Sequence, residues 1–311
     1  MEILSIGELI VEIMRKEVDA PLCAPADFTG PYPSGAPAIF ADQAARLGHQ
    51  VGFIGAVGDD DFGLCLTGRL ADDGLDTSYI ARVASPASGC AFVTYFSDGT
   101  RKFVFHIGNS AAGQLPEPDP AAFVGLKWLH ICGSTLSASP QMRERCYRAC
   151  ELAAQAGARI AFDPNLRPEL LGGEEALRRV CGPVLQRAAL VLPSASEAQV
   201  LTGQADAAEA CQALLDQGCE VVALKRGAEG CTVYSPAGVI EAPSFSVQAV
   251  DPTGAGDCFD AGFVVGLLEE LPLSEVARLA NACGALGATR KGPMEGARWR
   301  DEVEALLAAQ G

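Results

Sequence analysis

Short apolar segments alternate with stretches of helical periodicity along most of the chain, and this alternation limits the possible folds more than any other feature of the sequence. The strand-like apolar segments are Ile3–Ile6, Val51–Ile54, Trp128–Cys132, Arg159–Phe162, Leu190–Leu192 and Val221–Leu224. The helical stretches are Ala38–Leu47, Phe62–Leu70, Gln141–Ala156, Glu174–Leu185, Ala207–Gln217 and, after Asp251, Gly256–Leu268, Ser274–Thr289 and Trp299–Ala309. Strands separated by helices in this way predict an α/β fold with a mostly parallel sheet covered by helices on both faces.

Two further segments look like strands but fall outside this alternation. Leu9–Met14 and Ser88–Phe105 both alternate polar with apolar residues, as strands with one solvated face do. Between them, Pro21–Pro37 is rich in proline and glycine and is expected to connect the first of these strands back to the core. We therefore expect a small β-strand lid, built from about 9–34 and 88–110, over the main sheet.

The charge balance excludes several classes of partner. The 311 residues include 23 Lys and Arg against 39 Asp and Glu, a formal net charge of −16, whereas nucleic acids and anionic membranes attract positive charge. The longest apolar runs, such as Ala261–Leu268, are far shorter than the roughly 20 residues of a membrane span. Met1–Ser5 lacks the pattern of a signal peptide. We expect one soluble, cytoplasmic domain over residues 1–311 that binds neither nucleic acid nor membrane.

The cysteines and histidines do not indicate a metal site or a disulfide framework. No two of the twelve cysteines are three positions apart, so the chain contains no C-x-x-C pair. The three histidines are too few and too scattered for a histidine-rich metal site. We expect the cysteines to be reduced thiols that pack as small core residues.

The glycine pattern excludes the two best-known nucleotide motifs. No lysine follows a glycine, so the phosphate loop G-x-x-x-x-G-K-[ST] is absent. The chain has one G-x-G, at Gly254–Gly256, and Phe259 stands where a dinucleotide fingerprint needs its third glycine. A phosphate-loop nucleotidase and a nicotinamide-dependent dehydrogenase are both disfavoured.

That same glycine pair is suited to binding an anion. Gly254, Ala255 and Gly256 precede an apolar helix, and their small side chains leave consecutive backbone N–H groups open at its N-terminus. Unpaired N–H groups and the positive end of the helix dipole together attract a phosphate or a developing negative charge. Asp257 follows in the first turn, where it is either a reactive group beside this anion hole or an ordinary N-terminal cap of the helix.

Several motifs together carry a resemblance to a known family. The run Asp251–Phe259, D-P-T-G-A-G-D-C-F, resembles the C-terminal signature of the ribokinase-like (PfkB) carbohydrate kinases. The other matching segments, in family order, are Ser34–Ala38 and Val51–Gly63 for the N-terminal signature, Phe162–Pro168 for the D-P-N-x-R of the fructokinase and 2-keto-3-deoxygluconate kinase branches, and Lys225–Gly230 and Asn281–Ala285 for the nucleotide site. The resemblance implies a ribokinase-like fold and an ATP-dependent sugar kinase.

The resemblance also assigns roles to individual residues. It implies that Asp257 accepts the proton of a sugar primary hydroxyl while Gly254, Ala255 and Gly256 stabilise the transferring phosphoryl group. The implied sugar contacts are Glu12, Gly35, Ala36, Arg167 and Asp257. The implied nucleotide contacts are Lys225, Gly227, Gly230, Gly254, Gly256 and Asn281. Mg²⁺ is expected to arrive with ATP beside Glu197, and a monovalent cation such as K⁺ beside Asp251 and Thr253. For Arg167, a purely structural salt bridge is the alternative.

Three departures from the family pattern bear on the substrate. Ser34 replaces the first residue of a Gly-Gly pair, Ile39 stands where a sugar-contacting Asn is common, and Ser194 replaces Asn in an N-x-x-E pattern. In addition, Phe105 and Ile107 stand where 2-keto-3-deoxygluconate kinases place groups that bind a carboxylate, and an apolar pair cannot neutralise one.

A neutral ketohexose of the fructose or tagatose type is therefore the expected acceptor, with 2-keto-3-deoxygluconate as the alternative. A nucleoside kinase and a non-catalytic sugar-binding relative are more distant alternatives. The exposed edges of the lid strands also favour a homodimer that pairs through them.

Overall fold

The computed structural model describes residues 1–310 of the chain, and nine strands form its main sheet. In sheet order they are β13 (Gly238–Ala242), β12 (Cys231–Ser235), β11 (Val221–Lys225), β10 (Leu190–Val191), β9 (Arg159–Asp163), β8 (Trp128–Cys132), β1 (Ile3–Ile6), β4 (Val51–Gly58) and β5 (Ile80–Val83). The seven strands from β11 to β5 run parallel, and β12 and β13 are antiparallel additions. All six predicted strands lie in the parallel part.

Three strands of this sheet, β5, β12 and β13, were not predicted. The residues of β12 are mostly buried, whereas those of the two edge strands, β5 and β13, are mostly half-buried or exposed. An edge strand buries less apolar surface than a central parallel strand, so its sequence lacks the continuous apolar run on which the prediction relied.

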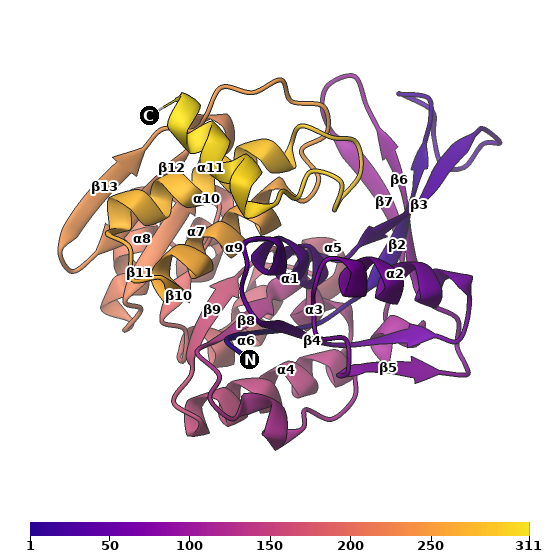
Figure 1. Ribbon diagram of the computed structural model, residues 1–311, viewed down its shortest axis with the longest axis horizontal. Helices are drawn as coiled ribbons and strands as arrows, with labels where there is room; N and C mark the ends of the chain where they lie inside the picture. The colour runs from indigo at the N-terminus through magenta and orange to yellow at the C-terminus, as the bar shows by residue number, and fades with distance from the viewer. Residues whose placement is uncertain (311) are drawn as a thin grey trace.

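Helices cover both faces of the main sheet (Figure 1). They are α1 (Ala36–Arg46), α2 (Asp61–Asp72), α3 (Gly133–Ala138), α4 (Pro140–Gln155), α5 (Pro168–Leu171), α6 (Glu174–Leu185), α7 (Ala195–Thr202), α8 (Ala207–Asp216), α9 (Ala255–Leu268), α10 (Leu273–Gly287) and α11 (Arg300–Ala309). One apolar core joins the sheet to α1, α9, α10 and α11, and a second joins its other face to α4, α6 and α8. Strand β1 alternates between them, since Ile3 belongs to the first core and Leu4 to the second. The predicted α/β layering is confirmed, and α3, α5 and α7 are short additions.

A separate four-stranded sheet forms the lid, which projects from the body at the upper right of Figure 1. Its order is β3 (Phe28–Ser34), β2 (Ile10–Arg15), β6 (Gly89–Tyr95) and β7 (Arg101–His106). The Pro- and Gly-rich segment expected to connect the first lid strand to the core contains a strand, β3, which lies within the predicted lid range 9–34. Pro31 and Pro33 are compatible with a strand here because β3 lies at the edge of its sheet, where a missing N–H costs no ladder hydrogen bond.

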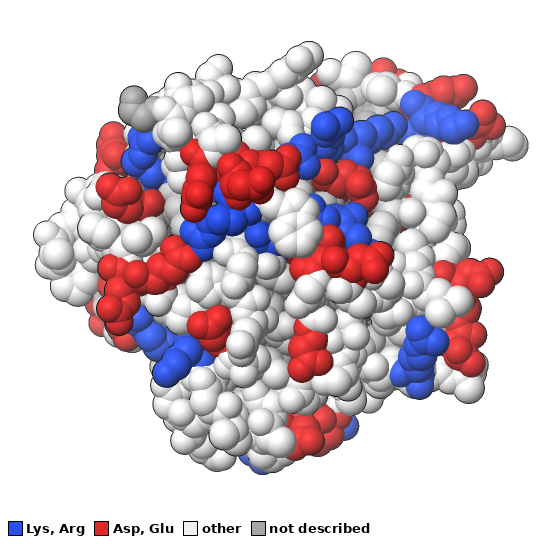
Figure 2. All heavy atoms as spheres, in the orientation of Figure 1, with Lys and Arg blue, Asp and Glu red and all other residues white. Residues whose placement is uncertain are grey.

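The cysteines follow the sequence expectation, and the surface carries mixed charge. All twelve cysteines are free thiols, and nine of them are buried. On the face shown in Figure 2, basic side chains lie beside acidic ones, as in the Arg300–Glu269 and Arg298–Glu302 ion pairs. Among the described residues, none of the helices combines the length and the apolar character that a membrane crossing requires.

Candidate active site

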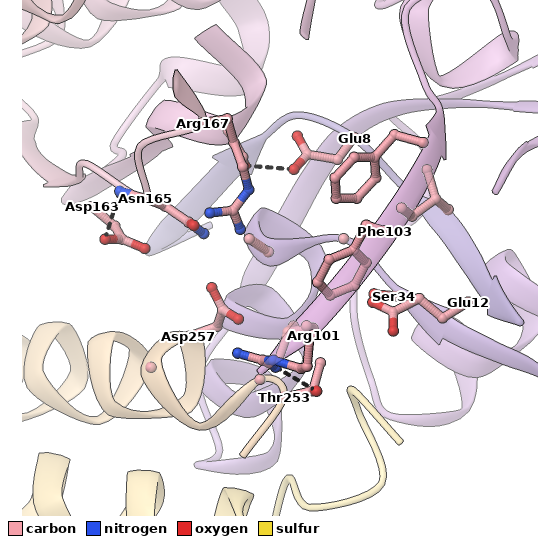
Figure 3. Close-up of a pocket in the computed structure, with 18 of the residues that line it drawn as sticks. Glu8, Glu12, Ser34, Arg101, Phe103, Asp163, Asn165, Arg167, Thr253 and Asp257 are labelled. Carbon is pink, nitrogen blue, oxygen red and sulfur yellow. Dashed lines mark hydrogen bonds between the residues drawn. The ribbon is translucent and has the colours of Figure 1, made fainter. Parts of the chain in front are cut away.

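A cavity of about 600 Å³ lies between the lid and the carboxyl ends of the parallel strands. The loops that follow β1 and β9, the last residue of β11, the start of α9 and the lid strands β2 and β7 all contribute to its lining. The carboxyl ends of parallel strands are where α/β sheets place their ligands. The charged side chains of the lining are Glu8, Glu12, Arg101, Asp163, Arg167, Glu197, Lys225 and Asp257, most of which are drawn in Figure 3.

The N-terminus of α9 opens into this cavity. Gly254 is the N-cap residue with φ +81°, and a β-carbon there would collide with the carbonyl of Pro293, so the position requires glycine. A β-carbon on Gly256 would meet only the Lys225 ammonium, at 3.8 Å. No side chain caps this helix. The Ala255 N–H donates to the Pro252 carbonyl at 3.2 Å, and the next N–H groups, those of Gly256 and Asp257, remain available to an anion.

Asp257 lies in the first turn of α9 and is not the N-cap. Within the described residues its carboxylate accepts no hydrogen bond, and it lines the cavity. The capping alternative therefore does not apply. Burial, and next the negative charge of Asp163, raise the pKa of Asp257 to about 7, although Lys225 and Arg167 oppose this rise. A carboxylate with a pKa near neutrality is suited to act as a general base.

A buried ion network lies beside Asp257. The Lys225 ammonium contacts Asp163 Oδ1 at 3.0 Å and Asp260 Oδ2 at 3.1 Å. Asp260 is three residues after Asp257 on α9, so both carboxylates lie on the same side of the helix. The two carboxylates raise the pKa of Lys225 against the effect of its burial, which keeps a positive charge at this end of the cavity. Lys225 was predicted to contact the nucleotide, and the structure places it between two acids that also fix its position.

Glu12 and Ser34 lie in the lid part of the cavity, away from Asp257 in Figure 3. The Ser34 hydroxyl donates a 2.7 Å hydrogen bond to Glu12 Oε1. Burial is the main cause that raises the pKa of Glu12 to about 7. Gly35, with φ +113°, follows Ser34 and leads into Ala36 at the start of α1, and both line the cavity.

Arg167 points into the cavity and forms no ion pair among the described residues. Its guanidinium donates to the carbonyl of Leu166, so the alternative of a structural salt bridge does not hold. Nearby, Glu8 is a buried carboxylate that sequence reasoning missed. It accepts a 2.6 Å hydrogen bond from Ser134 and another from Thr135, and burial raises its pKa. Its position just after β1, at the carboxyl end of a central strand, was the available signal.

Arg101 is a second missed residue, and it comes from the lid. Phe105 and Ile107 line the cavity as expected, but Arg101 does so as well, and its Nη1 donates to Thr253 Oγ1 at 2.7 Å. The hairpin therefore contributes a cation in addition to the apolar pair, Phe105 and Ile107, that the sequence indicated. Side chains two residues apart on a strand share a face, so the sequence already placed Arg101 on the same face as Phe103 and Phe105.

The residues predicted to bind a monovalent cation form a tight hydrogen-bond cluster. Asp251 Oδ1 accepts from the backbone N–H and the hydroxyl of Thr253, at 3.0 and 2.7 Å. Asp251 Oδ2 accepts from the Tyr95 hydroxyl at 3.0 Å and from the Gly292 N–H at 3.1 Å. This carboxylate therefore already has four donors, and a cation beside it remains a prediction.

The other predicted residues are placed differently. Glu197 lines the cavity, but its carboxylate also accepts hydrogen bonds from two backbone N–H groups. The bond from the Ser194 N–H is part of the capping box of α7, and the second bond comes from the Leu166 N–H. Gly227, Gly230 and Asn281 are not part of the cavity lining. Asn281 is buried and its amide donates to the carbonyls of Ala242 and Pro243. Asn281 thus holds α10 against the end of β13, outside the cavity, and its contact with the nucleotide remains a prediction.

Comparison with known proteins extends this geometric description. The profile of the pfkB family carbohydrate kinases matches residues 2–300. The fructokinase of Escherichia coli is 34% identical over 281 residues, which cover 88% of this chain and 91% of that protein. A structure of a putative ribokinase II from Escherichia coli, in complex with ATP and Mg²⁺, is 38% identical with a TM-score of 0.93, over 99% of both chains. A fructokinase double mutant from Vibrio cholerae, with fructose, ADP and potassium bound, is 26% identical with a TM-score of 0.83, over 99% of this chain and 98% of that one.

The fold and the cavity, with an uncapped helix N-terminus beside a carboxylate, define a phosphotransferase of the ribokinase-like class. The chain belongs to the pfkB family of carbohydrate kinases. It is an ATP-dependent sugar kinase, as the sequence predicted.

Proposed function

We propose that this enzyme phosphorylates a primary hydroxyl of a neutral ketohexose of the fructose type, with Asp257 as the base. The observation that carries this proposal is the position of Asp257, in the first turn of α9 beside free backbone N–H groups and facing the cavity. The similarity to fructokinases over most of the chain supports the choice of sugar.

In the proposed reaction the acceptor oxygen forms a bond to the γ-phosphorus of ATP. Asp257 accepts the proton of that hydroxyl, the bond between the γ-phosphorus and the β,γ-bridging oxygen breaks, and ADP leaves. Charge that builds on the phosphoryl oxygens is stabilised by the N–H groups at Gly254–Gly256 and by the helix dipole. The Lys225 ammonium, which lies beside the same turn, adds positive charge.

The lining also fits Mg²⁺, which prefers carboxylate and phosphate oxygens. We propose that Mg²⁺ enters with ATP, held by the phosphates and by oxygens of Asp163 and Glu197. When bound, the metal neutralises phosphate charge. Asp163 Oδ2 has only a 4.0 Å contact with the Cys132 thiol among the described residues, so this oxygen remains available as a ligand. We further propose that the nucleoside part of ATP extends toward Gly227 and Gly230, outside the cavity.

The balance of the lining favours a neutral sugar with a few fixed polar contacts. Ile39, Phe103 and Phe105 form an apolar wall, and polar groups such as Glu12 and Arg167 stand around it. Arg101 would offer a second cation to an acidic acceptor, so the apolar hairpin no longer argues against 2-keto-3-deoxygluconate by itself. The comparisons do not support that acceptor, whereas they do include fructokinases.

A coupled assay of ADP formation tests this proposal. Purified enzyme with Mg²⁺ and ATP is given D-fructose, D-tagatose, D-ribose, 2-keto-3-deoxygluconate or adenosine in turn. We expect the highest kcat/KM with one of the two ketohexoses, and loss of that turnover in Asp257→Asn. A clear preference for the sugar acid or for adenosine would refute the ketohexose assignment. Binding of a sugar without any turnover would favour a non-catalytic relative.

A further inference from the structure

All four chain connections between the lid and the body lie at one end of the lid sheet. In the strand registers Ile10 is the partner of Ser34 and of Gly89, and Cys90 is the partner of His106. The chain enters or leaves the body next to these residues, and we call this end the base. At the other end, the tip, the strands are joined only to each other, β2 to β3 and β6 to β7.

The tip lies far from the base and has no chain connection to the body. Strand β6 has seven residues, and at about 3.3 Å per residue it spans about 20 Å. A sheet attached only at its base can tilt, so the tip depends on noncovalent contacts to keep its place over the cavity.

Two residues of the tip provide these contacts. Tyr95 and Arg101 are opposite residues of β6 and β7, so their side chains lie on the same face of the lid. The Tyr95 hydroxyl donates to Asp251 Oδ2 at 3.0 Å and lies 3.1 Å from Thr253 Oγ1. Arg101 Nη1 donates to the same Thr253 oxygen at 2.7 Å, beside Asp257 in Figure 3. In the part of the chain that the structure describes, no other hydrogen bond joins the tip to the body.

The body residues that receive these bonds are buried at the entrance to α9. Asp251 and Thr253 are 2% and 8% exposed, and they also bond to each other. Burial raises the pKa of Tyr95, so its hydroxyl keeps its proton and acts as a donor. Thr253 directly precedes Gly254, the N-cap residue of α9. One hydrogen-bonded cluster therefore joins the lid tip to the residue before the anion hole.

The position of the tip affects the reaction because the lid and the body share the wall of the cavity. Glu12 and Phe103 come from the lid, whereas Arg167 and Asp257 come from the body. An acceptor that contacts both sets keeps its hydroxyl at Asp257 only while the tip stays in place. Displacement of the tip would also admit water, and exclusion of water favours transfer to the sugar over hydrolysis of ATP.

We propose that Tyr95 is a positioning residue of this kinase, which together with Arg101 fastens the lid tip to Asp251 and Thr253 and so holds the acceptor and excludes water from the transferring phosphoryl group. We call these four residues the lid latch. Tyr95 does not line the cavity, so it acts on the reaction through the lid. The inference goes beyond the proposed function, because it requires a sugar under the lid but no particular sugar.

The test is Tyr95→Phe, which removes one oxygen atom and keeps the ring. The acceptor is the sugar with the highest kcat/KM in the panel above. We expect the KM for this sugar to rise about three- to tenfold, the effect of one lost hydrogen bond. The ratio of inorganic phosphate released to sugar phosphate formed should rise as well, because water gains access to the site. A purely structural role would lower stability without changing this ratio.

The matched control is Tyr147→Phe. Tyr147 also donates one hydroxyl hydrogen bond, to the Val180 carbonyl, and it packs against the second apolar core and not in the cavity. This variant should leave the sugar KM and the phosphate ratio at their wild-type values.

Hydrogen exchange of the protein alone gives a readout that needs no acceptor. In Tyr95→Phe the backbone amides of β6 and β7 near the tip should exchange faster than in the wild type, since local opening of the lid becomes easier. The amides of the central strand β8 should exchange at the wild-type rate, and Tyr147→Phe should leave the lid amides unchanged.

Replacement of Thr253 tests the other side of the latch. Thr253→Val removes the hydroxyl that Tyr95 and Arg101 contact, and it should reproduce the higher sugar KM and the higher phosphate ratio. Thr253→Ser keeps a hydroxyl and should recover most of this loss.

Three results would overturn the inference. The first is an unchanged sugar KM and phosphate ratio in Tyr95→Phe, and the second is an equal change in Tyr147→Phe. The third is an altered requirement for K⁺ with unchanged exchange of the lid amides, which would assign Tyr95 to a cation site beside Asp251. A preferred acceptor other than a ketohexose refutes the proposed function alone, because the latch is then measured with that acceptor.

Discussion

The replacement Asp257→Asn tests the proposed base and its electrostatic environment together. Asparagine has nearly the same size and shape, but it cannot accept the proton of the acceptor hydroxyl. We expect kcat to fall by roughly 10²–10⁴-fold, the usual contribution of a general base. Because the pKa of Asp257 is raised from 3.8 to about 7 by burial and by Asp163, the same replacement should also stabilise the fold.

The size and sign of this stabilisation follow from proton linkage. The folded protein holds the Asp257 proton more tightly than the unfolded chain does, so folding stability falls as the pH rises from 3.8 to about 7, and stays at the lower level above it. At about 1.4 kcal/mol for each pH unit, the full effect would approach 4 kcal/mol. The side chain is half-buried and faces the cavity, where water screens the charge, and we therefore expect about 2 kcal/mol.

The assay is chemical or thermal unfolding of both proteins at about pH 8 and about pH 5. At the higher pH the asparagine variant should be more stable by about 2 kcal/mol, or melt roughly 4 °C higher for a chain of this size. At the lower pH the gain should be less than half as large. Asp61→Asn is the matched control, since Asp61 also lies in the first turn of a helix but is exposed.

Two results would refute this reasoning, and they refute different parts of it. Wild-type turnover in Asp257→Asn would show that another group accepts the proton. A variant that is no more stable than the wild type at about pH 8, or equally stabilised at both pH values, would show that Asp257 is not held in an environment that disfavours its charge.

Three further predictions concern pH, the ion network and assembly. The value of kcat/KM for the acceptor should decline about tenfold per pH unit below about pH 7 and level off above that pH, because Asp257 must be ionised to accept a proton. A profile that stays flat down to about pH 5 would contradict this prediction. Lys225→Met should destabilise the fold by about 3–5 kcal/mol in denaturant unfolding, because two buried carboxylates lose their cation. The same loss should move the acid limb of the rate profile to higher pH. The control is Lys127→Met at an exposed position, and an equal loss of stability in both variants would disprove the role of the network. Val104 is 43% exposed on the lid edge strand β7 and should lie in the interface of the predicted homodimer. Val104→Lys should therefore shift the molar mass measured by size-exclusion light scattering toward the monomer. The control Val239→Lys, at an exposed position in β13, should leave the molar mass unchanged, and a wild-type monomer would rule this interface out.

Local patterns were sufficient for most of the fold. Central parallel strands are buried on both faces, and they produce continuous apolar runs that stand out in the sequence. Helices with one buried face have an equally clear periodicity. The strands β5 and β13 at the sheet edges lack such a run, and β3 contains two prolines, so these could not be found from apolar pattern alone. The strand β12 was also missed, although it is mostly buried.

Without the family resemblance, the site was predicted only where its residues are close in the sequence, whereas Glu12, Arg167, Glu197 and Lys225 were found through that resemblance. Gly254–Gly256 and Asp257 form one continuous segment, and their roles follow from the geometry of a helix N-terminus. Glu8 and Arg101 were missed because the signal of each is weak by itself. A position just after a strand, or a face shared with Phe103 and Phe105, indicates a cavity only once the arrangement of the strands is known.

By itself, the sequence determined that this chain forms an α/β sheet with a lid and that Asp257 follows a small-residue helix N-terminus of the kind suited to an anion. Only the tertiary structure decided which charges surround that aspartate. The Lys225 ammonium meets Asp163 and Asp260, which lie 62 and 35 residues away in the chain, and Ser34 meets Glu12 across two strands. Such pairs depend on strand order and register, which are fixed by the packing of the whole sheet and not by any local pattern.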